Sequence, residues 1–128
     1  MSARMTPLLQ VALGGALGAS ARYMTGIATA RLLGKGFPWG TLTVNIVGSF
    51  LMGVLVVALL HLSANRYAPL LMTGVLGGFT TFSAFSLDAI TLYERGQGAL
   101  AAAYVAGSVI LSLAALFAGL TLARSAVS

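Results

Sequence analysis

The chain has 128 residues, of which 59% are hydrophobic and 7% are charged. A soluble domain carries about 25% charged residues, so this composition excludes a water-facing globular surface and leaves lipid as the surrounding solvent. The lack of cysteine excludes disulfides, thiolate metal sites and cysteine nucleophiles, and the net charge of +5 is spread along the chain, as for contact with lipid headgroups rather than with nucleic acid.

Four apolar segments lie between the charges. A membrane-spanning helix needs about 20 largely apolar residues, and the segments at about 7–33, 38–62, 67–93 and 98–123 meet that length. The first is too long for a cleaved signal peptide and leads into three more spans. The loops between the segments are short. The sequence therefore predicts an all-α membrane protein, a single unit of four transmembrane helices across residues 1–128.

The first span contains Arg22. A central arginine costs at least about 2.5–3.5 kcal/mol on insertion scales, so an ionisable group at this depth is a functional candidate by default. Arg22 would draw anions into an aqueous vestibule. The alternatives are a structural pair with Asp88 or an arm that reaches the membrane interface.

The basic residues divide evenly between the two ends of the spans. An N-terminus inside the cell would leave three on each side: Arg4, Arg66 and Arg124 against Arg31, Lys35 and Arg95. A clear bias normally sets topology, so both insertions should have similar free energy. This balance predicts dual topology and an antiparallel dimer, unless partners or insertion kinetics impose one orientation.

Small residues recur at four-residue spacing in three spans, at Gly14 and Gly18, at Ser49 and Gly53, and at Ala115 and Gly119. Such pairs let helices approach closely. They predict contacts with a second copy of the chain, or contacts within one subunit.

The second and fourth spans carry polar stripes. Thr41, Asn45 and Ser49 recur every four residues along the second span, and Tyr104, Ser108 and Ser112 do so along the fourth. The amide of Asn45 can donate to an anion, or it can form an ordinary interhelical hydrogen bond. Two such stripes favour the lining of an ion path.

The third span has an interruption signal. Gly77 and Gly78 suit the end of a helix, because glycine accepts a left-handed conformation there, and Thr80, Thr81 and Ser83 are good N-cap residues for a new helix. The pattern predicts a helix broken mid-membrane. Its carbonyl end would favour a cation and its amide end an anion; a plain glycine kink is the alternative.

Two phenylalanines follow the predicted break. Phe82 and Phe85 are three residues apart and share a helix face. An aromatic ring has a positive edge, so two rings turned edge-on can stabilise an anion without donating a proton.

Three segments resemble one known family, the CrcB/Fluc fluoride channels. These are Gly14–Ala19 with Arg22-Tyr23, Gly40–Asn45 with Gly48–Phe50, and Gly77–Ser83. The third motif is the most specific. The resemblance implies a passive fluoride-selective channel in the cell (inner) membrane, which exports cytoplasmic fluoride and protects the cell from its toxicity.

The resemblance also implies an antiparallel homodimer with two separate pores. Phe82, Phe85 and Asn45 would line each pore, with Tyr104 and Ser108 in a polar track. Gly77 and Thr80 of both copies would offer carbonyl oxygens to a structural sodium ion, and Arg22 would lie near the vestibule.

Other functions compete with this one. A proton-coupled exporter of similar size would need a glutamate in the first helix, whereas the first acid here is Asp88. A fluoride/proton antiporter would need Asp88 or Glu94 to titrate. A structural membrane protein would explain the small residues but not Asn45 and the paired phenylalanines. An enzyme is not expected, because the lone His61 lies at a span end without a nucleophile.

Overall fold

The structure is a computed structural model that describes residues 5–128, and within that range it is entirely helical apart from short connections. Four elements are long: α1 (Met5–Leu33), α2 (Trp39–His61), α4 (Phe82–Glu94) and α5 (Gly98–Val127). Between α2 and α4 lie a 3-10 helix η1 (Asn65–Tyr67), a π-helix η2 (Pro69–Leu76) and a short helix α3 (Gly77–Phe79).

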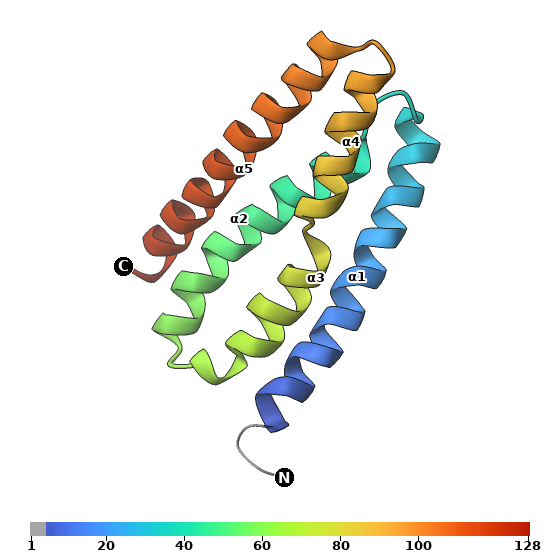
Figure 1. The fold of residues 1–128 in the computed structure, drawn as a ribbon. Helices are drawn as coiled ribbons and strands as arrows, with labels where there is room; N and C mark the ends of the chain where they lie inside the picture. Colours follow the sequence, from blue (N-terminus) through green and yellow to red (C-terminus); the bar gives the residue numbers. More distant parts are fainter. Residues whose placement is uncertain (1–4) are drawn as a thin grey trace.

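The helices alternate in direction. The α1–α2 and α4–α5 connections lie at one end of the bundle, and the α2–η1 connection lies at the other (Figure 1). Arg31, Lys35 and Arg95 therefore lie at one end, and Arg66 and Arg124 at the other. Arg4, which was counted with Arg66 and Arg124, lies outside the described residues. α5 continues to Val127, beyond the end expected at 123, so Arg124 is helical.

Three helical segments are long and apolar enough to cross a membrane: Trp39–His61, Asn65–Glu94 and Gly98–Val127. α1 has 29 residues but does not reach the same apolarity. Arg22 and Arg31, together with several glycines, serines and threonines, lower its mean hydropathy. The sequence predicts four spans, and three of them are long and apolar enough in the structure to meet that prediction.

The bundle consists of two closely packed pairs. α2 packs mainly against α5, and α1 packs mainly against η2 and α3. In the second pair, a β-carbon added at Gly74 would lie 2.9 Å from the Cα of Gly14, and one added at Gly78 would lie 2.8 Å from the carbonyl oxygen of Gly15. Glycine is therefore the residue that permits this approach.

The predicted small-residue contacts occur within one subunit. Gly14 and Gly18 face the backbone of η2, and Gly53 on α2 and Gly119 on α5 each face the backbone of the other helix. These glycines therefore pack within one subunit, which was the alternative to contacts with a second copy of the chain.

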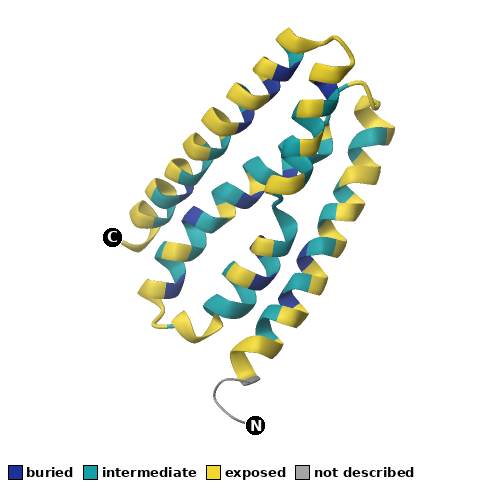
Figure 2. Cartoon of the chain, viewed as in Figure 1, coloured by how far each residue is buried: buried dark blue, intermediate teal, exposed yellow. Residues whose placement is uncertain are grey.

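The buried core is small and lies between the helices. Leu92, Ala101 and Tyr104 form one cluster, against which Phe37 and Phe85 pack. Most outward faces are exposed in the single chain (Figure 2). Lipid and other protein surfaces are the natural cover for such apolar faces.

The π-helix η2 was not expected from the sequence. Its first turn is tied to α1, because the backbone N–H of Leu70 donates to Oε1 of Gln10 at 3.2 Å. π-helical segments are rare and are found often at functional sites. η2 leads directly into the segment that carries the candidate site.

Candidate functional site

The backbone is extended at two residues between α3 and α4. Thr80 has φ −86° and ψ 159°, and Thr81 has φ −153° and ψ 125°. The Oγ1 of Thr81 accepts a hydrogen bond from the N–H of Ala84 at 3.1 Å, so Thr81 is the N-cap of α4. The sequence had placed Thr80, Thr81 and Ser83 together as cap candidates, and the structure selects Thr81.

The glycines before this point do not end the helix, which corrects the expectation of a left-handed glycine cap. Gly77 is right-handed helical, with φ −63° and ψ −37°, and the glycines with positive φ in the described chain are Gly34 and Gly96. The helix ends instead at Thr80, whose N–H and Oγ1–H both donate to the carbonyl of Leu76, at 3.0 and 2.8 Å. Close packing against α1 explains the glycine at position 78.

Asn45 on α2 holds the extended backbone at Thr81. Its Nδ2 donates to the Thr81 carbonyl at 3.0 Å, and its Oδ1 accepts from the Thr81 N–H at 2.8 Å. The two backbone partners determine which end of the amide is which. Nδ2 carries two hydrogens, so one remains for another acceptor. The interhelical hydrogen bond predicted as one alternative for Asn45 is therefore present. The second N–H of the amide remains able to donate to an anion.

Arg22 bonds to the end of α3. Its Nε donates to the carbonyl of Gly78 at 3.0 Å, across 56 residues of sequence. A cation at a helix C-terminus is favourable, because the carbonyls there have no helical partner. Arg22 therefore bonds to this backbone carbonyl rather than forming the pair with Asp88 that was one alternative.

Most of the predicted pore residues line one open groove of about 390 Å³ between α2, α4 and α5. Among the residues along its walls are Asn45, Ser49, Thr80, Thr81, Phe82, Phe85, Ser108 and Ser112. The two polar stripes predicted on α2 and α5 thus face the same groove at their centres. Thr81 was not a predicted pore residue, and only its cap pattern singled it out.

The two phenylalanines occupy different positions in this groove. Their ring centroids are 5.6 Å apart with an interplanar angle of 58°. Phe82 is 78% exposed in the single chain, whereas Phe85 is half-buried. Phe82 is therefore a wall residue with little cover from its own subunit.

Ser108 carries a buried and unsatisfied hydroxyl in the groove. It is 5% exposed, and its Oγ has no hydrogen-bond partner among the described residues. Most buried hydroxyls are bonded, and a serine in a helix can bond to its own backbone. An orphan hydroxyl in the wall of a groove is free to donate to a bound ligand.

Tyr104 lies behind the groove rather than in its lining. It is 1% exposed, and its hydroxyl donates to Oδ2 of Asp88 at 3.2 Å. Its ring contacts Phe85, at 5.3 Å between centroids, and Phe37, at 5.4 Å. Tyr104 therefore packs between Phe85, in the groove, and Phe37, in the connection between α1 and α2.

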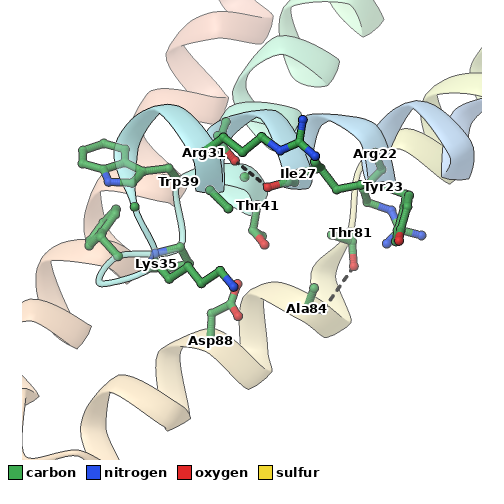
Figure 3. A pocket seen from close by; sticks show the side chains of 17 residues that line it. Arg22, Tyr23, Ile27, Arg31, Lys35, Trp39, Thr41, Thr81, Ala84 and Asp88 are labelled. Atoms are coloured by element: carbon green, nitrogen blue, oxygen red, sulfur yellow. Dashed lines mark hydrogen bonds between the residues drawn. The ribbon is translucent and has the colours of Figure 1, made fainter.

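A second pocket of about 600 Å³ opens between α1, the α1–α2 connection and α4. Arg22, Thr41 and Asp88 line it, so it fits the vestibule expected from Arg22 (Figure 3). Thr81 lines both this pocket and the groove. The extended segment is thus the boundary between them.

The carbonyls of Gly77 and Thr80, the predicted sodium ligands, are at the same interruption. The hydrogen bonds that Thr80, Arg22 and Asn45 donate there go to the carbonyls of Leu76, Gly78 and Thr81. The Gly77 and Thr80 carbonyls take part in none of these bonds. Backbone carbonyl oxygens that accept none of these hydrogen bonds are suitable ligands for a hard cation.

Comparison with known proteins identifies the family. The family model described as "CrcB-like protein, Camphor Resistance (CrcB)" matches residues 9–120. The chain belongs to the CrcB family. The resemblance seen in its three motifs is confirmed over residues 9–120 of this CrcB chain, which include most of the fourth long helix, α5.

Named relatives of this CrcB protein are similar along almost their entire length. The "Fluoride-specific ion channel FluC" of Cereibacter sphaeroides is 71% identical over 120 residues, covering 94% of this chain and 96% of the relative. The protein of that name from Paracoccus denitrificans is 60% identical, covering 91% and 93%. The one from Rhodospirillum centenum is 55% identical, covering 97% and 100%. The relatives are named as ion channels, a class that is not enzymatic. With its apolar helices, the chain is a multi-pass membrane protein.

Proposed function

We propose that this protein is a fluoride-selective channel that lets cytoplasmic fluoride leave passively down its electrochemical gradient. Fluoride enters acidified cells as neutral HF and dissociates inside, so a passive exit for the trapped anion protects the cell. The relatives named as fluoride-specific ion channels, at up to 71% identity, support this function.

The observation that carries the proposal is the orphan hydroxyl of Ser108 in the groove. It is buried, without a protein partner, and lines the same groove as Asn45, Phe82 and Phe85. Fluoride holds its water tightly, so a pore must replace those water molecules with close donors. The Ser108 hydroxyl, the second Asn45 N–H and the ring edges of the phenylalanines would do so.

The proposed path runs from the vestibule to the groove. Arg22 and Thr41 face the vestibule, Thr81 stands at the boundary, and Ser112 continues the groove beyond Ser108. Conduction requires sites that bind an ion and also release it. No lysine or arginine lines the groove among the described residues, so an anion there would not be held by a full positive charge.

The working unit is proposed to be an antiparallel dual-topology homodimer with all four spans, including α1, in the inner cell membrane. Phe82 supports a second copy, because its ring is largely uncovered in one subunit. The similar basic charge at the two ends supports insertion in both directions. Tags on the C-terminus should report both sides of the membrane; a single side would refute dual topology.

A structural sodium ion is proposed at the dimer centre, held by the carbonyl oxygens of Gly77 and Thr80 from both copies. Its positive charge would offset the negative carbonyl ends of two α3 helices, which meet there in the proposed dimer. The break in the third helix would then lie mid-membrane, where irregular backbone is tolerated only if protein or an ion satisfies it.

Fluoride efflux from liposomes that contain the purified protein tests the function, with chloride as the control ion. We expect fast fluoride efflux that does not respond to an imposed proton gradient, and no chloride efflux. Efflux that required a proton gradient would replace the channel with a fluoride/proton antiporter and would point to Asp88 or Glu94. Absence of fluoride efflux from folded protein would refute both.

Substitution of the rings tests the pore assignment. Phe82→Ile and Phe85→Ile should abolish fluoride flux while the dimer still assembles, because isoleucine retains bulk but lacks the polarised ring edge. Phe117→Ile on α5, an exposed phenylalanine that does not line the groove, is the matched control. Unchanged flux in both pore variants would defeat the assignment.

A further inference from the structure

The pocket that forms the vestibule also carries two cationic residues to which the proposed fluoride path assigns no role. Arg31 at the end of α1 and Lys35 in the following connection are both exposed and line the 600 Å³ pocket. Neither forms a hydrogen bond or ion pair with another residue between 5 and 128. Arg22, by contrast, is engaged with the Gly78 carbonyl. The pocket has three cationic side chains and one carboxylate, Asp88, towards which Lys35 extends (Figure 3).

The backbone at this place also offers a donor. At the connection between α1 and α2, the N–H of Gly34 donates to the Ala30 carbonyl, that of Trp39 to the Phe37 carbonyl and that of Leu42 to the Pro38 carbonyl. The N–H group of Lys35, which lines the pocket, donates to no protein group in the described chain. This free amide adds a donor beside the two cations for an anion with several oxygens.

The α1 wall of the pocket includes two exposed apolar side chains, Tyr23 and Ile27. Tyr23, Ile27 and Arg31 are four residues apart, so they form one stripe that descends about 12 Å from the cation at 1.5 Å per residue. Tyr23 is 71% exposed, and Ile27 is also exposed. A cation above an apolar stripe is the arrangement that a phospholipid needs, with its phosphate at the top and its acyl chain alongside.

The depth of the pocket agrees with this arrangement. Trp39 is the first residue of α2, is 37% exposed and lines the pocket (Figure 3). Tryptophan prefers the membrane–water interface, where headgroups lie. Basic pockets at that level between transmembrane helices are known to hold anionic headgroups.

We propose that the pocket formed by Arg31, Lys35, Trp39 and the Tyr23–Ile27 stripe binds one anionic phospholipid, with the lipid phosphate on the two cations and an acyl chain along α1. This site lies outside the proposed fluoride groove but in the same pocket as the vestibule, so a bound lipid would occupy part of the entrance to the proposed path. A free phosphate would satisfy the cations but leave the apolar stripe uncovered, so the geometry favours the lipid.

The only tryptophan in the sequence makes the site directly observable. In vesicles that contain the full-length protein, phosphatidylglycerol brominated on its acyl chains should quench Trp39 fluorescence more strongly than brominated phosphatidylcholine at the same mole fraction. Arg31→Gln with Lys35→Gln should remove this preference. Because each basic residue near an anionic surface contributes about fivefold, the relative affinity should fall roughly 30-fold.

The control removes the same charge from the other end of the bundle. Arg66→Gln with Arg124→Gln should leave the preference unchanged. Equal quenching by both lipids in the unmodified protein, or an equal loss of preference in the two double variants, would overturn the proposal. Relief of the quenching by millimolar inorganic phosphate would identify a free-anion site instead. If the double variant does not fold, each single variant should lower the preference about fivefold.

Discussion

Asn45 on α2 and Thr81 between α3 and α4 form a reciprocal pair of hydrogen bonds, at 3.0 and 2.8 Å, that joins an amide side chain to an extended backbone. The amide thereby bonds to both the N–H and the carbonyl of Thr81, a residue between two helices whose backbone groups have no helical partner. Thr81 also borders both the groove and the vestibule. The same contact therefore stabilises the interruption and sets the boundary of the proposed path.

Asn45→Ala should destabilise the protein. It leaves the N–H and the carbonyl of Thr81 without partners, which should lower the free energy of unfolding by about 2 kcal/mol. Ser49→Ala, one turn further along α2 in the same groove, is the control and should be nearly neutral. Thermal unfolding in detergent measures both. Equal melting temperatures for Asn45→Ala and the unmodified protein would show that this pair contributes nothing to stability.

Thr81→Ala should weaken the start of α4. The substitution removes the oxygen that accepts from Ala84, and loss of an N-cap costs about 1 kcal/mol. Thr81→Ser retains the oxygen and should restore the melting temperature. Ser86→Ala removes a hydroxyl that bonds only to its own helix, at the Phe82 carbonyl, and is the control. A serine variant as unstable as the alanine variant would contradict the capping role.

Ser108→Ala should slow fluoride flux without lowering the stability of the protein. Because its hydroxyl has no protein partner, removal should leave the melting temperature unchanged or slightly raised. If the hydroxyl donates to fluoride, the loss of one hydrogen bond to a charged group should slow efflux by about tenfold. Thr121→Ala, on the exposed side of the same helix, should alter neither quantity. A Ser108→Ala protein that was unstable but conducted normally would reverse this assignment.

Gly48→Ala should push α2 away from the interruption. A β-carbon there would overlap the methyl group of Thr80 and lie 3.4 Å from the Phe79 ring. Overpacking of this kind costs about 1–3 kcal/mol. Gly107→Ala on α5 meets nothing within 4 Å and should instead stabilise its helix by about 1 kcal/mol. Similar melting temperatures for the two variants would contradict the close approach at Gly48.

The tertiary contacts decided several roles that spacing left open. Gly14 and Gly18 form the same pattern whether they face a second copy or η2, and only the position of η2 beside α1 resolves it. The sequence offered Arg22 one protein partner, Asp88, whereas in the structure it bonds to the Gly78 carbonyl at the end of α3. Such partners lie tens of residues away in sequence, so local pattern does not identify them.

The sequence by itself determined the surrounding solvent, the main helices and most of the residues that line the groove. Low charge and long apolar runs leave lipid as the only solvent that suits the chain, and four-residue spacing places Asn45 and Ser49, like Ser108 and Ser112, on one helix face. What only the tertiary structure decided is where the third helix stops. Glycine permits a left-handed end without requiring it, and the close approach of α1 and the amide of Asn45 instead place the extended residues at Thr80 and Thr81.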